Sequence, residues 1–197
     1  MDKRDVSKLK KLTEEVSHPL DDAEIRKALG SGINIIPYND LKEYNYFPFD
    51  RKGRLIVFFA VDSQYSGHWQ CVLRYPDEKV IEYFDPYGID PMIGCQSWMT
   101  KAKQVELGED VNYAKILLTN EHDRGYKCVY NHHKFQNEND MNIQTCGRWC
   151  IVRLLFYKLT NEKFFQFISK MEKDTGLTGD GLITFVTTDK NILKLLK

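Results

Sequence analysis

A continuous apolar segment near the middle of the chain constrains the fold more than any other feature. Residues 54–61 read Arg-Leu-Ile-Val-Phe-Phe-Ala-Val and are rich in β-branched and aromatic side chains. An apolar run of this length without polar alternation is typical of a strand that is buried on both faces. We therefore expect residues 54–61 to form a central strand of a sheet.

Two further strands are predicted directly after this segment. Residues 68–75 alternate between apolar and polar side chains, residues 76–79 favour a hairpin turn, and residues 80–85 are again strand-like. His68 begins the first of these strands and Asp85 ends the second. Antiparallel pairing about the turn brings these two ends together, so a histidine is expected beside a carboxylate.

Helical patterns occupy most of the remaining chain. The strongest begins at Cys146, and the sum of the patterns predicts a single α+β domain over residues 1–197, with an antiparallel or mixed central sheet packed against the helix that begins at Cys146. Residues 1–30 are expected to form a peripheral helical N-terminal extension. Helices are predicted at 6–16, 21–29, 95–104, 146–159, 161–171 and after 181, a helical turn at 39–41, and weakly extended segments at 113–119 and 127–136.

Composition excludes several broad classes of protein. Of 197 residues 42% are hydrophobic, which favours a packed globule over a disordered chain. Lys plus Arg and Asp plus Glu are both 28, so no overall charge drives binding to nucleic acid or to a membrane. Neither a bilayer-length apolar run nor a signal-peptide core is visible, and five cysteines lack disulfide spacing. We expect an intracellular protein with reduced thiols and no membrane partner.

Cys146 is the strongest candidate for a reactive group. It is followed by Gly147 and then by an apolar helical run, so its thiol lies at the first turn of a buried helix. Unpaired amides and the helix dipole favour a thiolate at that position. His68 would serve as base, Asp85 would orient the imidazole, and the Cys146 N–H with a side-chain amide would hold an oxyanion. Cys150, one helical turn later, is assigned to packing.

Each of these residues also has a purely structural interpretation. His68 could be a surface histidine at a strand end, Asp85 could belong to an ordinary turn, and Cys146 could be a small buried apolar residue. A non-catalytic protein would require all three structural interpretations to be correct at once. It would also require the pairing of the two strands to bring His68 and Asp85 together by coincidence. The sequence therefore favours a Cys-His-Asp triad.

Three short motifs carry a resemblance to a known family. Residues 67–69 (Gly-His-Trp), 83–88 (Tyr-Phe-Asp-Pro-Tyr-Gly) and 145–150 (Thr-Cys-Gly-Arg-Trp-Cys) resemble, in the same chain order, the His, Asp and Cys motifs of the adenain and Ulp1-like cysteine proteases. Residues 35–41 also resemble an upstream segment of the processing proteases of large DNA viruses and related mobile elements. The resemblance covers about residues 30 to 160.

This resemblance implies a function as well as a fold. It implies the papain-inverted α+β fold, with Cys146 as nucleophile, His68 as base and Asp85 as orienter. It further implies a thiol endopeptidase that cleaves after glycine in precursors of virion proteins, within a host cell or a virion. An alternative is a deubiquitinase-like or deSUMOylase-like isopeptidase acting on ubiquitin-like proteins. Trp69 would line a narrow slot for glycine, and neither a metal nor another cofactor is expected.

The amide of the oxyanion hole departs from the family pattern. Better-known members carry a glutamine six or seven positions before the cysteine, where this chain has Asp140 and Asn139. We favour Gln136, because a side chain at the end of a predicted strand can point across at the active site. Gln144, on the loop that enters the helix, is the fallback, and either residue could be an ordinary polar loop residue.

Two non-catalytic alternatives must be considered. Cys128, His132, His133, Cys146 and Cys150 have spacings that could suit zinc, which would make Cys146 a ligand. This is disfavoured because Cys150 lies within an apolar helical face. Weak nucleic-acid binding could rest on interleaved basic and aromatic residues of the same region. These residues are Tyr126, Lys127, Tyr130, His132, His133 and Lys134.

Overall fold

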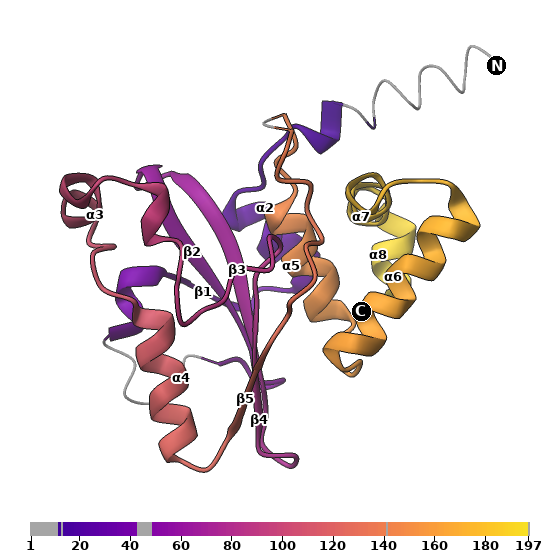
Figure 1. The fold of residues 1–197 in the computed structure, drawn as a ribbon. Coiled ribbons are helices and arrows are strands. Elements are labelled where there is room, and N and C mark those ends of the chain that lie inside the picture. Colours follow the sequence, from indigo (N-terminus) through magenta and orange to yellow (C-terminus); the bar gives the residue numbers. More distant parts are fainter. Residues whose placement is uncertain (1–11, 13, 43–48, 141, 197) are drawn as a thin grey trace.

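A five-stranded mixed sheet forms the centre of the protein (Figure 1). The computed structural model describes residues 12, 14–42, 49–140 and 142–196. The strand order is β1-β2-β3-β4-β5, and the two outer pairs are parallel while the two inner pairs are antiparallel. The predicted α+β class with a central sheet is confirmed. The strands are β1 (Asn34–Pro37), β2 (Arg54–Ser63), β3 (Ser66–Tyr75), β4 (Val80–Phe84) and β5 (Lys127–Tyr130).

Helices cover both faces of this sheet, as the apolar run of β2 requires. Figure 1 shows α4 on one side and α5, with α6 and α7 behind it, on the other. The helices are α2 (Asp22–Leu29), α3 (Lys101–Leu107), α4 (Tyr113–Asp123), α5 (Cys146–Leu155), α6 (Asn161–Thr175), α7 (Gly179–Thr188) and α8 (Lys190–Leu196), with short 3-10 turns η1 (Tyr38–Lys42) and η2 (Gln96–Trp98).

Strand alternation divides the apolar residues into two cores. On β2, Ile56 faces the core under α5, whereas Leu55 and Val57 face the core under α4. On β3, Cys71 faces the core under α5 and Val72 faces the core under α4. Because both faces are buried, β2 and β3 are held rigidly at the centre, and this is where the candidate site residues of the sheet lie.

Within residues 20–29, which were expected to be part of a peripheral extension, Leu20, Ile25, Ala28 and Leu29 are buried in the core. Ile25 has an exposed fraction of 0% and packs in the same cluster as α5. Asp21 caps α2 by accepting from the Glu24 N–H, and the Glu24 carboxylate accepts from the Asp21 N–H in return. The predicted helix 6–16 lies largely outside the described residues, although 14–16 are helical.

Some predicted elements were wrong or had different boundaries. Residues 113–119, predicted as extended, lie in α4, because Ala114, Leu117 and Leu118 share a helical face that packs on the sheet and Asn112 caps the helix. The helix expected at 95–104 divides into η2 and α3, and α5 ends at Leu155. Within the described residues, none of the helices combines the length and the apolar character that crossing a bilayer requires.

Candidate active site

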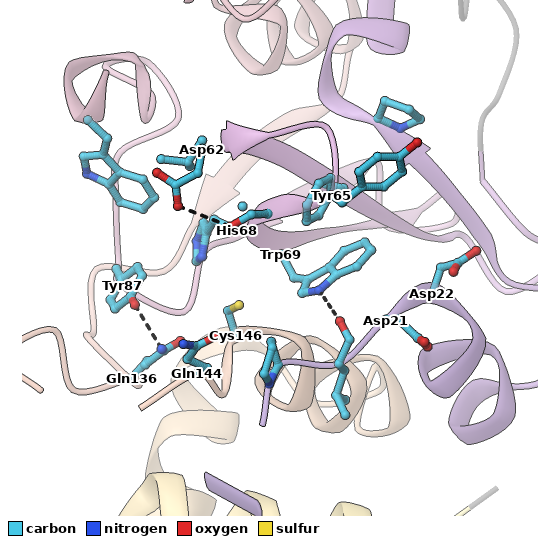
Figure 2. Close-up of a pocket in the computed structure, with 18 of the residues that line it drawn as sticks. Asp21, Asp22, Asp62, Tyr65, His68, Trp69, Tyr87, Gln136, Gln144 and Cys146 are labelled. Carbon is cyan, nitrogen blue, oxygen red and sulfur yellow. Dashed lines mark hydrogen bonds between the residues drawn. The ribbon is translucent and has the colours of Figure 1, made fainter. Parts of the chain in front are cut away.

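A groove of about 1270 Å³ runs across one end of the sheet, between β3 and the start of α5. The hairpin that joins β2 and β3 forms one wall, and the loops before α2 and α5 form the others. Figure 2 shows His68 and Cys146 in the middle of this groove. On one side of them lie Tyr87, Gln136 and Gln144, and on the other side lie Trp69, Asp21 and Asp22.

His68 and Asp85 form a buried pair, as the strand pattern predicted. The His68 Nε2 lies 3.1 Å from Asp85 Oδ2, and the two residues have exposed fractions of 3% and 0%. The β3–β4 register pairs Cys71 with Phe84, so the hairpin delivers the two residues to the same end of the sheet. With Nε2 directed at Asp85, Nδ1 is the ring nitrogen that can face the Cys146 sulfur.

The environment of His68 favours its protonated form. Burial of the ring opposes a positive charge, but the Asp85 carboxylate and then Cys146 outweigh it and raise the pKa of His68 to about 10. At neutral pH the imidazole is therefore an imidazolium between a carboxylate and a thiol. This charge state is the one required to stabilise a thiolate and to donate a proton later.

Cys146 is the first residue of α5, where the sequence predicted it. Its exposed fraction is 9%, so the thiol is reached only from the groove. A β-carbon on Gly147 would lie 3.1 Å from Trp69 Cδ1 and 3.3 Å from Leu20 Cβ. The glycine therefore allows the helix start to approach β3 closely, which places the sulfur against His68.

Thr145 and Trp149 anchor this helix to Asp180 of α7. The Asp180 Oδ1 accepts from the Thr145 hydroxyl and, at 2.8 Å, from the Trp149 indole, while Oδ2 accepts from the Asn137 N–H. Asp180 has an exposed fraction of 5%. It thus links the start of α5 to the loop after Gln136. Asp180 was not among the predicted site residues, because it lies 34 positions after Cys146 and carries no local motif.

Gln70 is a second residue that the sequence analysis missed. Its Nε2 donates to Asp85 Oδ2 at 2.6 Å, and its Oε1 accepts from the Tyr83 hydroxyl at 2.6 Å. The Asp85 Oδ1 accepts from the Tyr87 N–H at 2.7 Å. These bonds fix the carboxylate that faces His68. Alternation along β3 could have found Gln70, since it lies two residues after His68 and therefore on the same face.

The two candidate amides of the oxyanion hole occupy different environments. Gln136, with an exposed fraction of 2%, is buried in a loop and not at a strand end, because β5 ends at Tyr130. Its Nε2 donates to the Tyr87 hydroxyl and to the Ile143 carbonyl, both at 2.9 Å. Gln144 is exposed at the edge of the groove, and its backbone N–H donates to Val16.

Aromatic side chains enclose the imidazole. The Tyr87 ring stacks on His68 with centroids 4.9 Å apart, and the Trp98 ring meets it edge-on at 5.2 Å. Trp69 lines the groove, with its indole N–H donating to the Leu20 carbonyl at 2.9 Å and its ring tilted against Phe58. These rings limit the access of water to His68 from the sides.

Carboxylates line the outer parts of the groove. Among the described residues that line it there are five acidic side chains and neither lysine nor arginine. The groove therefore has a local negative charge, although the whole chain has a net charge of zero. The acidic residues are Asp21, Asp22, Asp62, Glu138 and Asp140.

The residues of the zinc alternative have other partners in the structure. The Cys128 thiol donates to the Leu118 carbonyl, and His133 stacks on Phe165 at 3.6 Å. Cys150 is fully buried, and burial raises its pKa well above the ordinary value. In the part of the chain that the structure describes, no three His, Cys, Asp or Glu side chains are grouped so that they could hold a metal ion.

Comparison with known proteins relates the chain to a viral protein. The chain is 28% identical over 170 residues to a protein of the Sputnik virophage described as uncharacterized protein V9, and the match covers 85% of this chain and 93% of the virophage protein. No family model matches the chain. The similarity supports a viral origin, and the name of the relative carries no activity.

Proposed function

We propose that this protein is a thiol endopeptidase that uses Cys146, His68 and Asp85. The observation that carries the proposal is the position of the buried His68 imidazole between the Asp85 carboxylate, 3.1 Å away, and the Cys146 thiol that lines the groove. Cys146 is the first residue of α5, so the unpaired backbone N–H groups of the helix start lie beside the reacting sulfur. The arrangement also supports the finer assignment to the papain-inverted fold of the adenain and Ulp1-like proteases.

The chemical steps follow from these positions. The Cys146 thiolate attacks the scissile carbonyl, a C–S bond forms, and the π electrons move to the carbonyl oxygen. The Cys146 N–H, one of the amides that a helix start leaves unpaired, donates to that oxyanion. As the tetrahedral intermediate collapses, His68 gives its proton to the leaving amine. Water, deprotonated by His68, then hydrolyses the thioester.

The shape of the groove supports an extended polypeptide as substrate. Trp69 packs against the start of α5 so closely that a β-carbon on Gly147 would touch it, which leaves little room beside the sulfur. A glycine on the acyl side of the scissile bond suits such a site. The family resemblance of the sequence motifs suggests virion precursors with glycine-rich cleavage sites as the natural substrates, and the relative contributes only its virophage source.

Deconjugation of a ubiquitin-like protein is the second candidate function. The exposed side chain of Tyr65 at the tip of the β2–β3 hairpin borders the groove, and its exposed fraction of 93% offers a contact for a folded partner. The geometry of the site supports zinc binding and nucleic-acid binding less well than it supports proteolysis. A groove lined by carboxylates repels phosphates, which a protein binds chiefly through lysine and arginine.

A cleavage assay tests the proposal directly. Wild-type protein and the Cys146→Ser and His68→Ala variants are incubated with Gly-Gly peptide reporters and a panel of ubiquitin-like fusions. Loss of the nucleophile is expected to lower kcat on the order of 10⁴-fold or more. Cys128→Ser is the matched control, because it removes a thiol outside the groove and keeps a donor for the Leu118 carbonyl.

Three outcomes have different meanings. Full activity of Cys146→Ser would refute the mechanism. Cleavage of the ubiquitin-like panel alone would favour deconjugation over virion maturation. Stoichiometric zinc in the purified protein that is lost in Cys128→Ser would favour the zinc alternative and would also contradict Cys146 as nucleophile.

A further inference from the structure

Both N–H groups of the Gln136 amide are already used. The Nε2 atom donates to the Ile143 carbonyl and to the Tyr87 hydroxyl oxygen, each at 2.9 Å. A primary amide has only two N–H groups, and its nitrogen cannot accept. Gln136 therefore has no donor left for an oxyanion in this arrangement. Its Oε1 is buried, and within the described residues it has no hydrogen-bond partner.

The Tyr87 hydroxyl, by contrast, has a proton to donate. Its oxygen accepts from Gln136, so its own O–H must point elsewhere. Among the hydrogen bonds of the described residues, none has this hydroxyl as donor. Tyr87 lines the groove together with Cys146, and Figure 2 shows the Tyr87–Gln136 bond to one side of Cys146, which lies in the middle of the groove.

The surroundings keep this hydroxyl both protonated and fixed. Burial, followed by the negative charges of Cys146 and Asp85, raises the pKa of Tyr87 to about 12, so the phenol remains a donor when the thiolate forms. The ring stacks on His68. The Pro86 carbonyl accepts from the backbone N–H of Gln136, which joins the Tyr87 turn to the Gln136 loop.

We propose that the Tyr87 hydroxyl is the side-chain donor of the oxyanion hole and that Gln136 is a positioning residue that holds this hydroxyl. The proposal rests on the proposed protease function. When the thiolate attacks, the carbonyl π electrons move to oxygen, and this oxygen accepts from the Cys146 N–H and the Tyr87 O–H. The phenol keeps its proton. When the tetrahedral intermediate collapses, the electron pair on the oxyanion re-forms the C=O bond and the C–N bond breaks. His68 then protonates the leaving amine.

Tyr87→Phe tests the donor, because it removes the hydroxyl and keeps the ring on His68. With a Gly-Gly reporter, kcat is expected to fall by about 10²-fold to 10³-fold while KM changes little. The rate at which iodoacetamide alkylates Cys146 should stay within about twofold of the wild-type rate, because this reaction needs the thiolate–imidazolium pair but no oxyanion donor. Tyr130→Phe is the matched control: it removes a hydroxyl that bonds Asp90, outside the groove.

A double-mutant cycle separates the roles of Tyr87 and Gln136. If Gln136 acts through Tyr87, Gln136→Met lowers kcat in the wild-type background but adds less than about threefold to the loss in Tyr87→Phe. Multiplicative losses in the double variant would overturn the proposal and make Gln136 a direct donor. So would a Tyr87→Phe variant that keeps at least half of the wild-type kcat while Cys146→Ala is inactive. Cleavage by Cys146→Ala would instead refute the protease function itself.

Discussion

Replacement of Asp85 by asparagine should change the charge of His68 at neutral pH. The Asp85 carboxylate, 3.1 Å from Nε2, is the largest influence that raises the His68 pKa to about 10. Asparagine keeps the size and an acceptor oxygen but removes the charge, whereas the burial that disfavours an imidazolium remains. We expect the pKa to fall by about 3.5 units or more, to 6.5 or below, which corresponds to at least about 5 kcal/mol.

The assay is an NMR titration of the histidine Cε1–H signals, in which His68 is assigned by its absence in His68→Gln. The matched control is Glu109→Gln, which also converts a buried carboxyl to an amide; this carboxyl accepts from the Ala60 N–H and not from His68. A His68 midpoint that stays above about 9 in Asp85→Asn would refute the assignment of Asp85 as the source of the shift.

The same substitution has a consequence for stability. Because the folded-state pKa of His68 is raised, the pair stabilises the fold fully below about pH 6.5, and this contribution is lost as pH rises towards 10. Between these values the free energy of unfolding of the wild type should fall by up to about 1.4 kcal/mol per pH unit relative to Asp85→Asn. Parallel pH profiles from urea unfolding of the two proteins would contradict this linkage.

Three further substitutions test the framework of the site. Arg153→Met leaves the Glu82 carboxylate buried without its cation, and urea unfolding should show a loss of about 3–5 kcal/mol. Gly67→Ala would put a β-carbon 2.0 Å from the Phe59 carbonyl oxygen, so a lower melting temperature and loss of cleavage are expected. Asp180 accepts three hydrogen bonds, and Asp180→Asn should cost about 1–3 kcal/mol on unfolding because one acceptor becomes a donor. An unchanged melting temperature in either of the last two variants would contradict the corresponding packing argument.

Local sequence patterns were sufficient to predict the central hairpin. The apolar run at 54–61 predicted a buried strand, and the turn at 76–79 set the register that pairs the His68 and Asp85 ends. The start of α5 at Cys146 was also predictable, because the apolar helical face begins there. These features depend on neighbours within a few residues, and such short-range patterns are readable from one sequence.

The local sequence did not determine the structure of segments whose residues favour both helix and strand. Residues 113–119 contain β-favouring Tyr113 and Ile116, yet α4 forms because Leu117 and Leu118 cover the sheet from one helical face. Residues 20–29 similarly become core because α5 offers them an apolar surface. In residues 113–119 the free energy of burial outweighs the local preference, whereas residues 21–29 are helical as predicted and burial decides only their place in the core; in both segments that burial depends on distant elements.

The sequence by itself determined which residues could do chemistry: a cysteine at a helix start and a histidine and an aspartate at paired strand ends. Only the tertiary structure decided how they are supported. Gln70 holds Asp85, Asp180 ties the start of α5 to the Gln136 loop, and Gln136 turns its amide to Tyr87. Hydrogen-bond direction depends on where loops from separate parts of the chain meet, and no local pattern encodes that meeting.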